Sequence, residues 1–240
     1  MSWFANWFDS SYYHILYKNR DEKEAGLCID NLVQHLQIPQ GSALIDIACG
    51  KGRHATYFNS LGLDVVGVDL SPNSIAAATK NENENLQFAV HDMREVYQKN
   101  SFDVVTNLFT SFGYFEGNTD EQKAINAMAS NLKSEGILII DFMNVKKVIA
   151  NLAASEHKTI DSIIFNIRRK VKAGRIIKDI EIIDGTEKQY FQEKVKAITL
   201  ADYSEFISNA GLKIIDIFGN YKLEGFNATS SDRLILICKK

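Results

Sequence analysis

The sequence predicts an α/β fold, built on a mostly parallel sheet that closes with an antiparallel pair of strands. Short apolar segments rich in Val and Ile alternate with helical segments through roughly the first 145 residues. Such alternation requires right-handed crossovers between parallel strands. Near residue 159 the pattern changes to consecutive strands with turn signals between them, which indicates an antiparallel β insert.

Five parallel strands are expected first, with helices between them. The segment Ser71-Pro72, for example, places a capping residue and then a proline at the first position of a helix. The helix over 119–132 leads into the fifth strand through Ser134-Glu135-Gly136. The five strands are predicted over 43–47, 63–69, 86–91, 102–109 and 137–142.

The insert and the end of the chain complete the predicted architecture. Strands are expected over 160–171, 175–184 and 187–198, followed by a helix over 201–210. The last two strands have no helix between them, so they should pair antiparallel. We therefore predict three parts: a helical lid over 1–40, a core made of 41–158 and 199–240, and the insert over 159–198 as a cover for the substrate.

Composition and charge narrow the class of protein. The 240 residues carry a net charge of −3, which argues against a general nucleic-acid binder. Three distant cysteines (Cys28, Cys49, Cys238) indicate neither a disulfide framework nor a metal site. The N-terminal sequence has no basic start before an apolar core, and no uncharged run is long enough to cross a bilayer. We expect a cytoplasmic protein without membrane partners, either a monomer or a homodimer.

A glycine turn follows the first strand and predicts a cofactor site. Gly50 and Gly52 remove side chains where a ligand would lie against the backbone. The helix that begins near Arg53 turns free N–H groups toward the same place. Such turns also merely close loops, so the turn alone does not decide between a cofactor site and a structural role.

Carboxylates at the ends of the strands favour one kind of cofactor. Each acid alone is an ordinary turn residue, but several in one cleft favour a cation and resist a pyrophosphate. Asp69, about twenty residues past the glycines, can accept hydrogen bonds from both hydroxyls of a ribose. The acids expected at this edge are Asp46, Asp69, Asp92 and Asp141.

A dinucleotide is the competing cofactor. Gly50, Gly52 and Ala55 satisfy the Gly-x-Gly-x-x-Gly/Ala spacing, and Tyr190 and Lys194 have the Tyr-x-x-x-Lys spacing of some reductases. The second pair falls in a predicted strand, where residues four apart stand too far from each other for that pairing. We therefore keep an NAD(P)-dependent oxidoreductase only as an alternative.

Over about residues 40–145 the chain resembles the class I S-adenosylmethionine-dependent methyltransferases. The resemblance rests on the segments from Ile45 to Gly52, Val68-Asp69, His91-Asp92-Met93 and Asn107-Leu108, and the closing pair is similar to that family's sixth and seventh strands. It implies a Rossmann-like, seven-stranded mixed sheet with S-adenosyl-L-methionine as cofactor. The implied cofactor contacts are Ala48 and Gly50 at the methionyl part and ribose, Asp69 at the ribose, Asp92 and Met93 at adenine, and Leu108 at the methionyl chain. Asp46, one of the acids expected at the strand ends, is also assigned to the cofactor site.

A narrower resemblance covers most of the chain. The segments from Tyr13 to Arg20 and from Ser111 to Tyr114, together with the insert, resemble small-molecule N-methyltransferases that act on nucleotide-linked amino sugars. This implies that Tyr13 and Arg20 help to hold the cofactor. Tyr114 stands where a His is usual, which leaves the proton acceptor and the catalytic residue unknown.

The N-terminal segment is predicted to be a lid with a polar face. Tyr13, Tyr17 and Arg20 are spaced by four and three residues, which places them on one face of a helix. We assign Tyr17 to the cofactor together with the other two. Tyr13 and Tyr114 are expected to face the acceptor from the lid and from the sheet.

The predicted function is methyl transfer to a nitrogen or oxygen of a small-molecule acceptor. The alternatives are a non-catalytic cofactor-binding protein and an RNA methyltransferase. Arg168, Lys170 and Lys172 alternate onto one face of a predicted strand, where an anionic substrate group or an RNA strand could bind. Acidic residues follow at once and no aromatics are interleaved, which argues against RNA.

Overall fold

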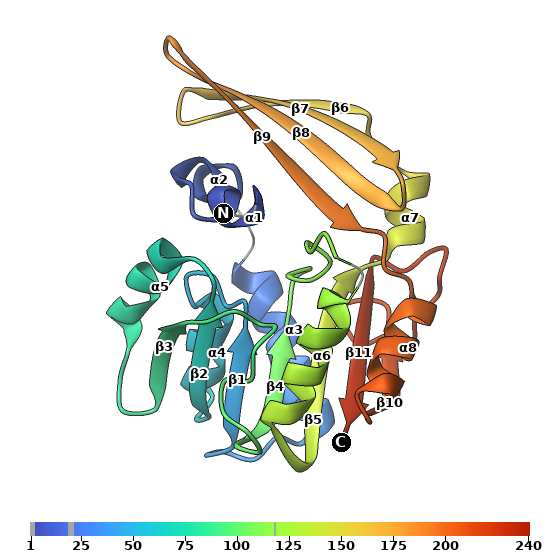
Figure 1. Ribbon diagram of the computed structural model, residues 1–240. Helices are drawn as coiled ribbons and strands as arrows, with labels where there is room; N and C mark the ends of the chain where they lie inside the picture. The colour runs from blue at the N-terminus through green and yellow to red at the C-terminus, as the bar shows by residue number, and fades with distance from the viewer. Residues whose placement is uncertain (1–2, 19–21, 118) are drawn as a thin grey trace.

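The computed structural model describes residues 3–18, 22–117 and 119–240, and its core is a seven-stranded sheet (Figure 1). The strand order is β10-β11-β5-β4-β1-β2-β3. β11 runs antiparallel to both of its neighbours, and the remaining pairs are parallel, so the predicted mixed sheet is confirmed. The strands are β1 (Ala43–Ile47), β2 (Asp64–Asp69), β3 (Leu86–Val90), β4 (Phe102–Asn107), β5 (Leu132–Met143), β10 (Lys213–Phe218) and β11 (Arg233–Lys239).

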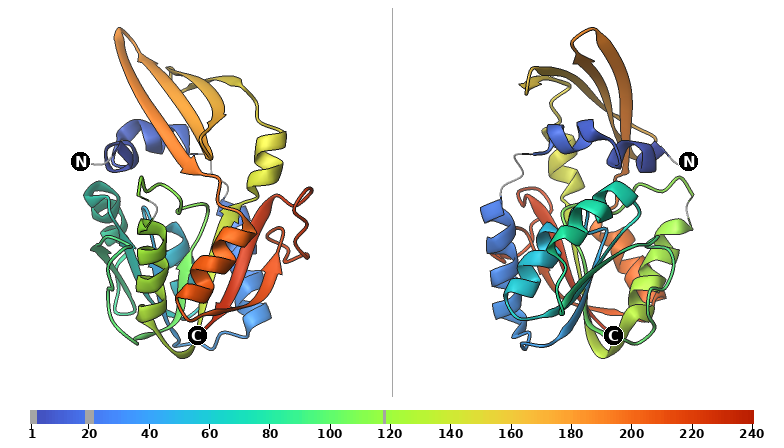
Figure 2. Two further views of the ribbon diagram at one scale, coloured as in Figure 1. Left: turned by 45° about the vertical axis from the view of Figure 1, so that its right-hand side comes forward. Right: turned by 90° about the vertical axis from the view of Figure 1, so that its left-hand side faces the viewer.

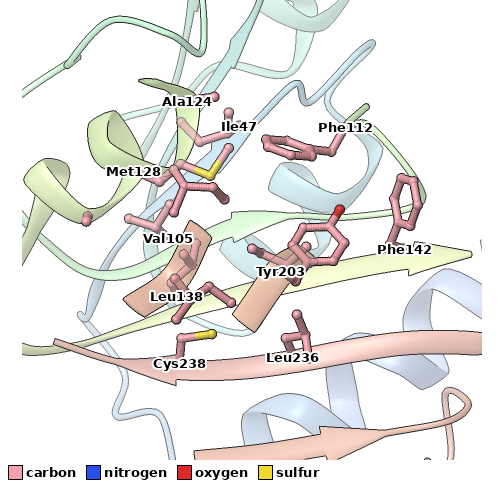
Figure 3. Close-up of a cluster of buried hydrophobic side chains, with 14 of the residues drawn as sticks. Ile47, Val105, Phe112, Ala124, Met128, Leu138, Phe142, Tyr203, Leu236 and Cys238 are labelled. Carbon is pink, nitrogen blue, oxygen red and sulfur yellow. The ribbon is translucent and has the colours of Figure 1, made fainter. Parts of the chain in front are cut away.

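Helices cover both faces of this sheet. On one face, α6 (Asp120–Asn131) and α8 (Leu200–Asn209) bury Met128 and Tyr203 against the strands (Figure 3). On the other face lie α3 (Glu22–Leu36), α4 (Arg53–Ser60) and α5 (Pro72–Ala78), followed by a 3₁₀ turn over Thr79–Asn81. Burial on both sides explains why the parallel strands read as continuous apolar runs.

Strand order reverses between β1 and β4. β1 pairs with β2 on one side and with β4 on the other, so the loops after β1 and β4 diverge from one edge of the sheet. Open α/β sheets bind ligands at such a point, outside the carboxyl ends of the strands. The glycine turn follows β1 directly, and the loop after β4 contains Tyr114.

The insert is a separate four-stranded antiparallel sheet. It comprises β6 (Ser155–Ile160), β7 (Ile163–Lys172), β8 (Arg175–Asp184) and β9 (Glu187–Lys196), and α7 (Val145–Ala150) connects it to β5. The three predicted strands are present, but the sheet begins at 155 and not at 159. β6 was missed because Ser-Glu-His-Lys-Thr-Ile carries almost no apolar signal.

The first two helices pack against the insert. α1 (Trp3–Phe8) and α2 (Ser11–Leu16) lie between the insert and the seven-stranded sheet, as both views in Figure 2 show. Trp7 and Leu16 join Phe165 and Ile180 of the insert in an apolar cluster of their own. We call α1, α2 and the sheet β6–β9 the cap. α3 belongs instead to the core cluster beside α4, so the predicted unit 1–40 is divided between the cap and the core.

Local signals account for several helix boundaries. The Ser10 side chain accepts a hydrogen bond from the Tyr13 backbone N–H and caps α2, and Ser71 caps α5 with Pro72 at the first position. All three cysteines are free and buried. Within the described ranges, no helix is long and apolar enough to cross a membrane.

Candidate cofactor and acceptor site

A cavity of about 480 Å³ lies at the switch point, between the carboxyl ends of the strands and the cap. Its size is within the usual range for small-molecule sites, about 300–1,000 Å³. Arg20 lies outside the described residues. Every other predicted site residue lines this cavity: Tyr13, Tyr17, Asp46, Ala48, Gly50, Asp69, Asp92, Met93, Leu108 and Tyr114.

The two glycines of the turn differ in what surrounds them. Gly50 has φ +58°, and an ideal Cβ there would meet no atom within 4 Å, so its backbone borders open space. A Cβ at Gly52 would come within 2.5 Å of the Phe88 ring. The expectation that both glycines make room for a ligand is therefore wrong for Gly52, because the Phe88 ring fills that place.

Asp69 is fixed at the end of β2 by backbone donors. Its Oδ2 accepts from the Gly50 N–H at 2.8 Å, and its Oδ1 accepts from the Ser71 N–H at 2.8 Å. Burial raises the pKa of this carboxyl, and the backbone hydrogen bonds oppose that shift. Since a carboxylate has about four lone-pair sites, it can still accept from two hydroxyls.

Asp46 carries a buried oxygen without a partner. Its Oδ1 accepts from the Thr106 hydroxyl at 2.8 Å, whereas Oδ2 finds no hydrogen-bond partner among the described residues. Burial, with a smaller contribution from Asp69, raises the pKa of Asp46 to about 7. A buried acceptor without a donor is costly, so the site is suited to a ligand that brings one.

The other two predicted acids are neutralised by arginines. Asp92 lines the cavity, but Arg94 Nε lies 3.0 Å from its Oδ1 and lowers its pKa. Asp141 is fully buried, accepts from Arg233 Nε at 2.7 Å and from the Phe109 N–H at 2.9 Å, and does not line the cavity. Of the four carboxylates expected at this edge, only Asp46 and Asp69 are not paired with an arginine.

The loop after β4 is held in a strained conformation. Phe109 and Thr110 both have positive φ, 56° and 63°, which is unusual for residues with side chains. Asp141 fixes this loop, because its side chain and its backbone carbonyl accept from the two N–H groups. Such strain gathers at functional sites. The sequence gives no signal of it, since Asp141 is 32 residues away from Phe109.

Aromatic rings enclose the side of the cavity nearest the cap. The Phe8 ring meets both Tyr13 and Tyr114 edge-on, each at 5.0 Å between centroids. The Tyr114 hydroxyl donates to the Thr110 carbonyl at 2.7 Å, which fixes the ring. Tyr13 and Tyr114 were predicted to face each other across the acceptor. Phe8 contacts both rings and so lies between them.

Tyr17 lies at the C-terminal end of α2 and shares a face with Tyr13, as predicted. Its backbone N–H donates to the Tyr13 carbonyl at 3.1 Å, and the centroids of the two rings are 5.0 Å apart. The Tyr17 hydroxyl donates to Glu193 Oε1 at 2.8 Å and also contacts the Lys178 ammonium group. Its ring lines the cavity while its hydroxyl ties α2 to the insert.

The basic run of the insert lies away from the cavity. Arg168 and Lys170 are exposed, and Lys170 pairs with Asp179 at 2.8 Å on the outer face of the sheet. Arg169 pairs with Glu156, and neither Lys170 nor Lys172 lines the cavity. Arg168, Lys170 and Lys172 therefore form a solvated face of the insert, not a wall of the cavity.

Residues 38–196 match a family model described as a methyltransferase domain. The chain belongs to this methyltransferase family. It is 26% identical over 214 residues to a dTDP-3-amino-3,4,6-trideoxy-alpha-D-glucopyranose N,N-dimethyltransferase from Streptomyces venezuelae, with 84% of this chain and 89% of the relative covered.

Solved structures show the same fold over nearly the whole chain. An S-adenosylmethionine-dependent methyltransferase from Clostridium acetobutylicum superposes with a TM-score of 0.80 at 18% identity, covering 95% of both chains. An amino pentose methyltransferase from Micromonospora echinaspora, solved with S-adenosylmethionine bound, has a TM-score of 0.71 at 19% identity and covers 96% of this chain and 97% of its own. The predicted class I fold is confirmed.

The cofactor of this methyltransferase is S-adenosylmethionine. The residues that line the cavity also fit this cofactor, independently of the comparisons. Gly50 borders open space, Asp69 keeps acceptor capacity, and Asp46 Oδ2 lacks a donor that an ammonium group would supply. Membership of this family favours S-adenosylmethionine over the dinucleotide that the spacing of the glycines also allowed.

Proposed function

We propose that this methyltransferase methylates the nitrogen of a small-molecule amine. The observation that carries the proposal is the aromatic enclosure of Phe8, Tyr13 and Tyr114 on the cap side of the same cavity whose floor suits the cofactor. Aromatic faces attract an alkylammonium group and leave little room for water. The relative that acts on a dTDP-linked 3-amino sugar supports nitrogen over oxygen as the acceptor atom.

The floor of the cavity is proposed to hold the cofactor. Asp69 would bind the ribose hydroxyls, and Asp46 would accept from the ammonium group of the methionyl part. Ala48, Gly50 and Leu108 would border that part, while Asp92 and Met93 would flank adenine, with Asp92 kept in place by Arg94. Tyr13, Tyr17 and Arg20 retain their predicted role in cofactor binding from the N-terminal side.

When bound, the sulfonium supplies the methyl group, whose carbon bonds to the acceptor nitrogen as its bond to sulfur breaks and leaves a neutral thioether. The residues of this chain act by alignment and by excluding water. Tyr114, fixed through Thr110, and Tyr13, on the cap, would limit the positions that the acceptor nitrogen can take in the cavity. Such alignment supplies several kcal/mol without a covalent intermediate, up to about 7–11 kcal/mol in well-oriented systems.

Two measurements test this proposal. S-adenosylmethionine and its demethylated product should each raise the melting temperature, by about 5–10 °C at roughly 100 times Kd, whereas NAD should not. A panel of glycine, sarcosine, tyramine and phenethylamine should then yield a product that is heavier by one methyl group in mass spectrometry. Cofactor binding without methylation of any amine, or methylation of RNA instead, would contradict the assignment of the acceptor.

A further inference from the structure

The His14 imidazole lies in the wall of the cavity and makes no hydrogen bond to any described residue. It lies on α2, and its ring meets the ring of Tyr13 edge-on at 5.4 Å. Nε2 is shielded from solvent and has no partner among the described residues, and no hydrogen bond joins Nδ1 to a described residue. The ring is therefore placed by packing, and its lone pair is not committed to the protein.

Several other titratable groups that line the cavity are held by contacts within the protein. Asp69 accepts two backbone N–H groups, Asp92 pairs with Arg94, and the Tyr114 hydroxyl donates to a carbonyl. His91 Nε2 lies 2.9 Å from the Glu95 carbonyl, and His54 Nε2 lies 3.1 Å from Arg53 Nη2. Asp46 retains one unpaired oxygen, but it lies at the end of β1, on the cofactor side.

The charges around His14 favour its neutral form. Burial and the positive charge of Lys51, on the glycine turn, lower the pKa of His14, and Asp9, between α1 and α2, opposes them. Asp9 is itself held by the Ser71 hydroxyl and by the backbone N–H of Asn73 at the start of α5. Lys18 and Asp69 line the same cavity from α2's end and from β2. At neutral pH the imidazole is thus uncharged and able to accept a proton.

We propose that His14 is the catalytic base that takes the proton from the incoming ammonium group. The inference rests on the proposed amine acceptor. It assigns to His14 the role of proton acceptor, for which the sequence offered no residue because Tyr114 stands where a His is usual. The proton moves from the ammonium nitrogen to Nδ1, the ring nitrogen that is not shielded, while Nε2 keeps its own proton. The electron pair of the broken N–H bond remains on the amine as the attacking lone pair. The imidazolium then releases the proton to water before the next turnover.

The first test needs no turnover. An NMR titration of the histidine side chains, with the His14 signal assigned by its loss in His14→Gln, should give a pKa below the ordinary 6.5. Lys51→Met should raise that pKa, because it removes a neighbouring cation, and Asp9→Asn should lower it. A His14 that is protonated at pH 7 would overturn the proposal, whatever the acceptor proves to be.

The second test uses the amine acceptor found in the panel. His14→Gln and His14→Asn should lower kcat by about 100-fold or more, within the range of about 10²–10⁴ for a general base. The acid limb of the pH profile should disappear, while the Kd of S-adenosylmethionine measured by calorimetry stays close to that of the wild type.

The matched control is His35→Gln, because His35 lies on α3 beside Asp216, outside the cavity. It should keep both the rate and the acid limb. A His14→Gln enzyme with wild-type kcat, or with weaker cofactor binding but normal turnover at saturation, shows that His14 is not the base. Absence of any methylated amine with the wild-type enzyme points instead to failure of the proposed function.

Discussion

The two walls of the cavity are built in different ways. On the floor, the polar groups come from short segments and are held by the backbone, as where Asp69 accepts from Gly50 and Ser71. On the cap, the contacts join segments far apart in the chain, such as Trp7 and Glu193, which are 186 residues apart. The floor is thus encoded locally, whereas the cap depends on tertiary packing with its own apolar cluster.

The cap should therefore loosen without disturbing the floor. Glu193 accepts from Trp7 Nε1 at 2.7 Å and from the Tyr17 hydroxyl, and it lies 3.5 Å from the Lys178 ammonium group. Glu193→Ala leaves that buried cation without its carboxylate, which should destabilise the cap by roughly 3 kcal/mol. Amide hydrogen exchange in α1, α2, β8 and β9 should accelerate, with β1 and β4 unchanged.

The matched control is Lys170→Met, which breaks an exposed ion pair with Asp179 on the outer face of the same strands. Exposed pairs contribute about 0–1 kcal/mol, so exchange should barely change. Equal acceleration in the cap and in the central strands of Glu193→Ala would mean that the two walls unfold together.

The floor should respond most strongly to Asp69→Ala. Loss of hydrogen bonds to a charged acceptor, each worth about 1.5–3 kcal/mol, should raise the Kd for S-adenosylmethionine by about 10–100-fold in calorimetry. Asp64→Ala, at the exposed beginning of the same strand, is the control and should bind like the wild type. Unchanged affinity in Asp69→Ala would remove this residue from the proposed site.

Cofactor affinity should also depend on pH through Asp46. The pKa of Asp46 is about 7 in the folded protein, above the ordinary 3.8. Between these two values the folded apo protein binds a proton that the unfolded chain does not. Proton binding by Asp46 therefore stabilises the fold at low pH, and this stabilisation is lost as pH rises from about 4 to about 7. An ammonium donor needs the ionised form, so affinity should fall about tenfold from pH 8 to pH 6. Asp46→Asn should flatten this dependence, and a steep dependence that survives the substitution would assign it to another group.

Tyr114 lies where the floor and the cap meet. Its substitution should have a smaller effect than the changes above, and the effect should be on the rate of methyl transfer and not on cofactor binding. Tyr114→Ala removes an aromatic face worth about 0.5–2 kcal/mol to a cation, which should lower kcat by about tenfold with cofactor binding nearly unchanged. Tyr114→Phe keeps the ring and should retain most of the rate. A joint loss of thermal stability and cofactor affinity, with a normal rate on bound substrate, would identify Tyr114 as a core residue only.

The sequence predicted what is local and missed what is distant. Most helices and strands and the cap at Ser71 follow from short patterns. The residues along the floor were predicted from such patterns together with the resemblance to the class I methyltransferases. The pairing of Asp141 with Arg233 joins residues 92 positions apart, and no periodicity could reveal it. The places of Phe8 between two tyrosines and of His14 on the cavity side of the cap likewise depend on how α1 and α2 pack against the insert.

Phe88 links two glycines that belong to different segments. A Cβ on Gly52 or on Gly67 would come within 2.5 Å of the same ring. The three positions therefore form one steric unit, in which a methyl group can be added to either glycine only if residue 88 becomes smaller. In related chains positions 67 and 88 should covary, whereas position 52 is also constrained by its φ of +80°. An alignment that scores the glycine turn by itself would attribute to the cofactor constraints that come from the Phe88 ring and from the backbone conformation.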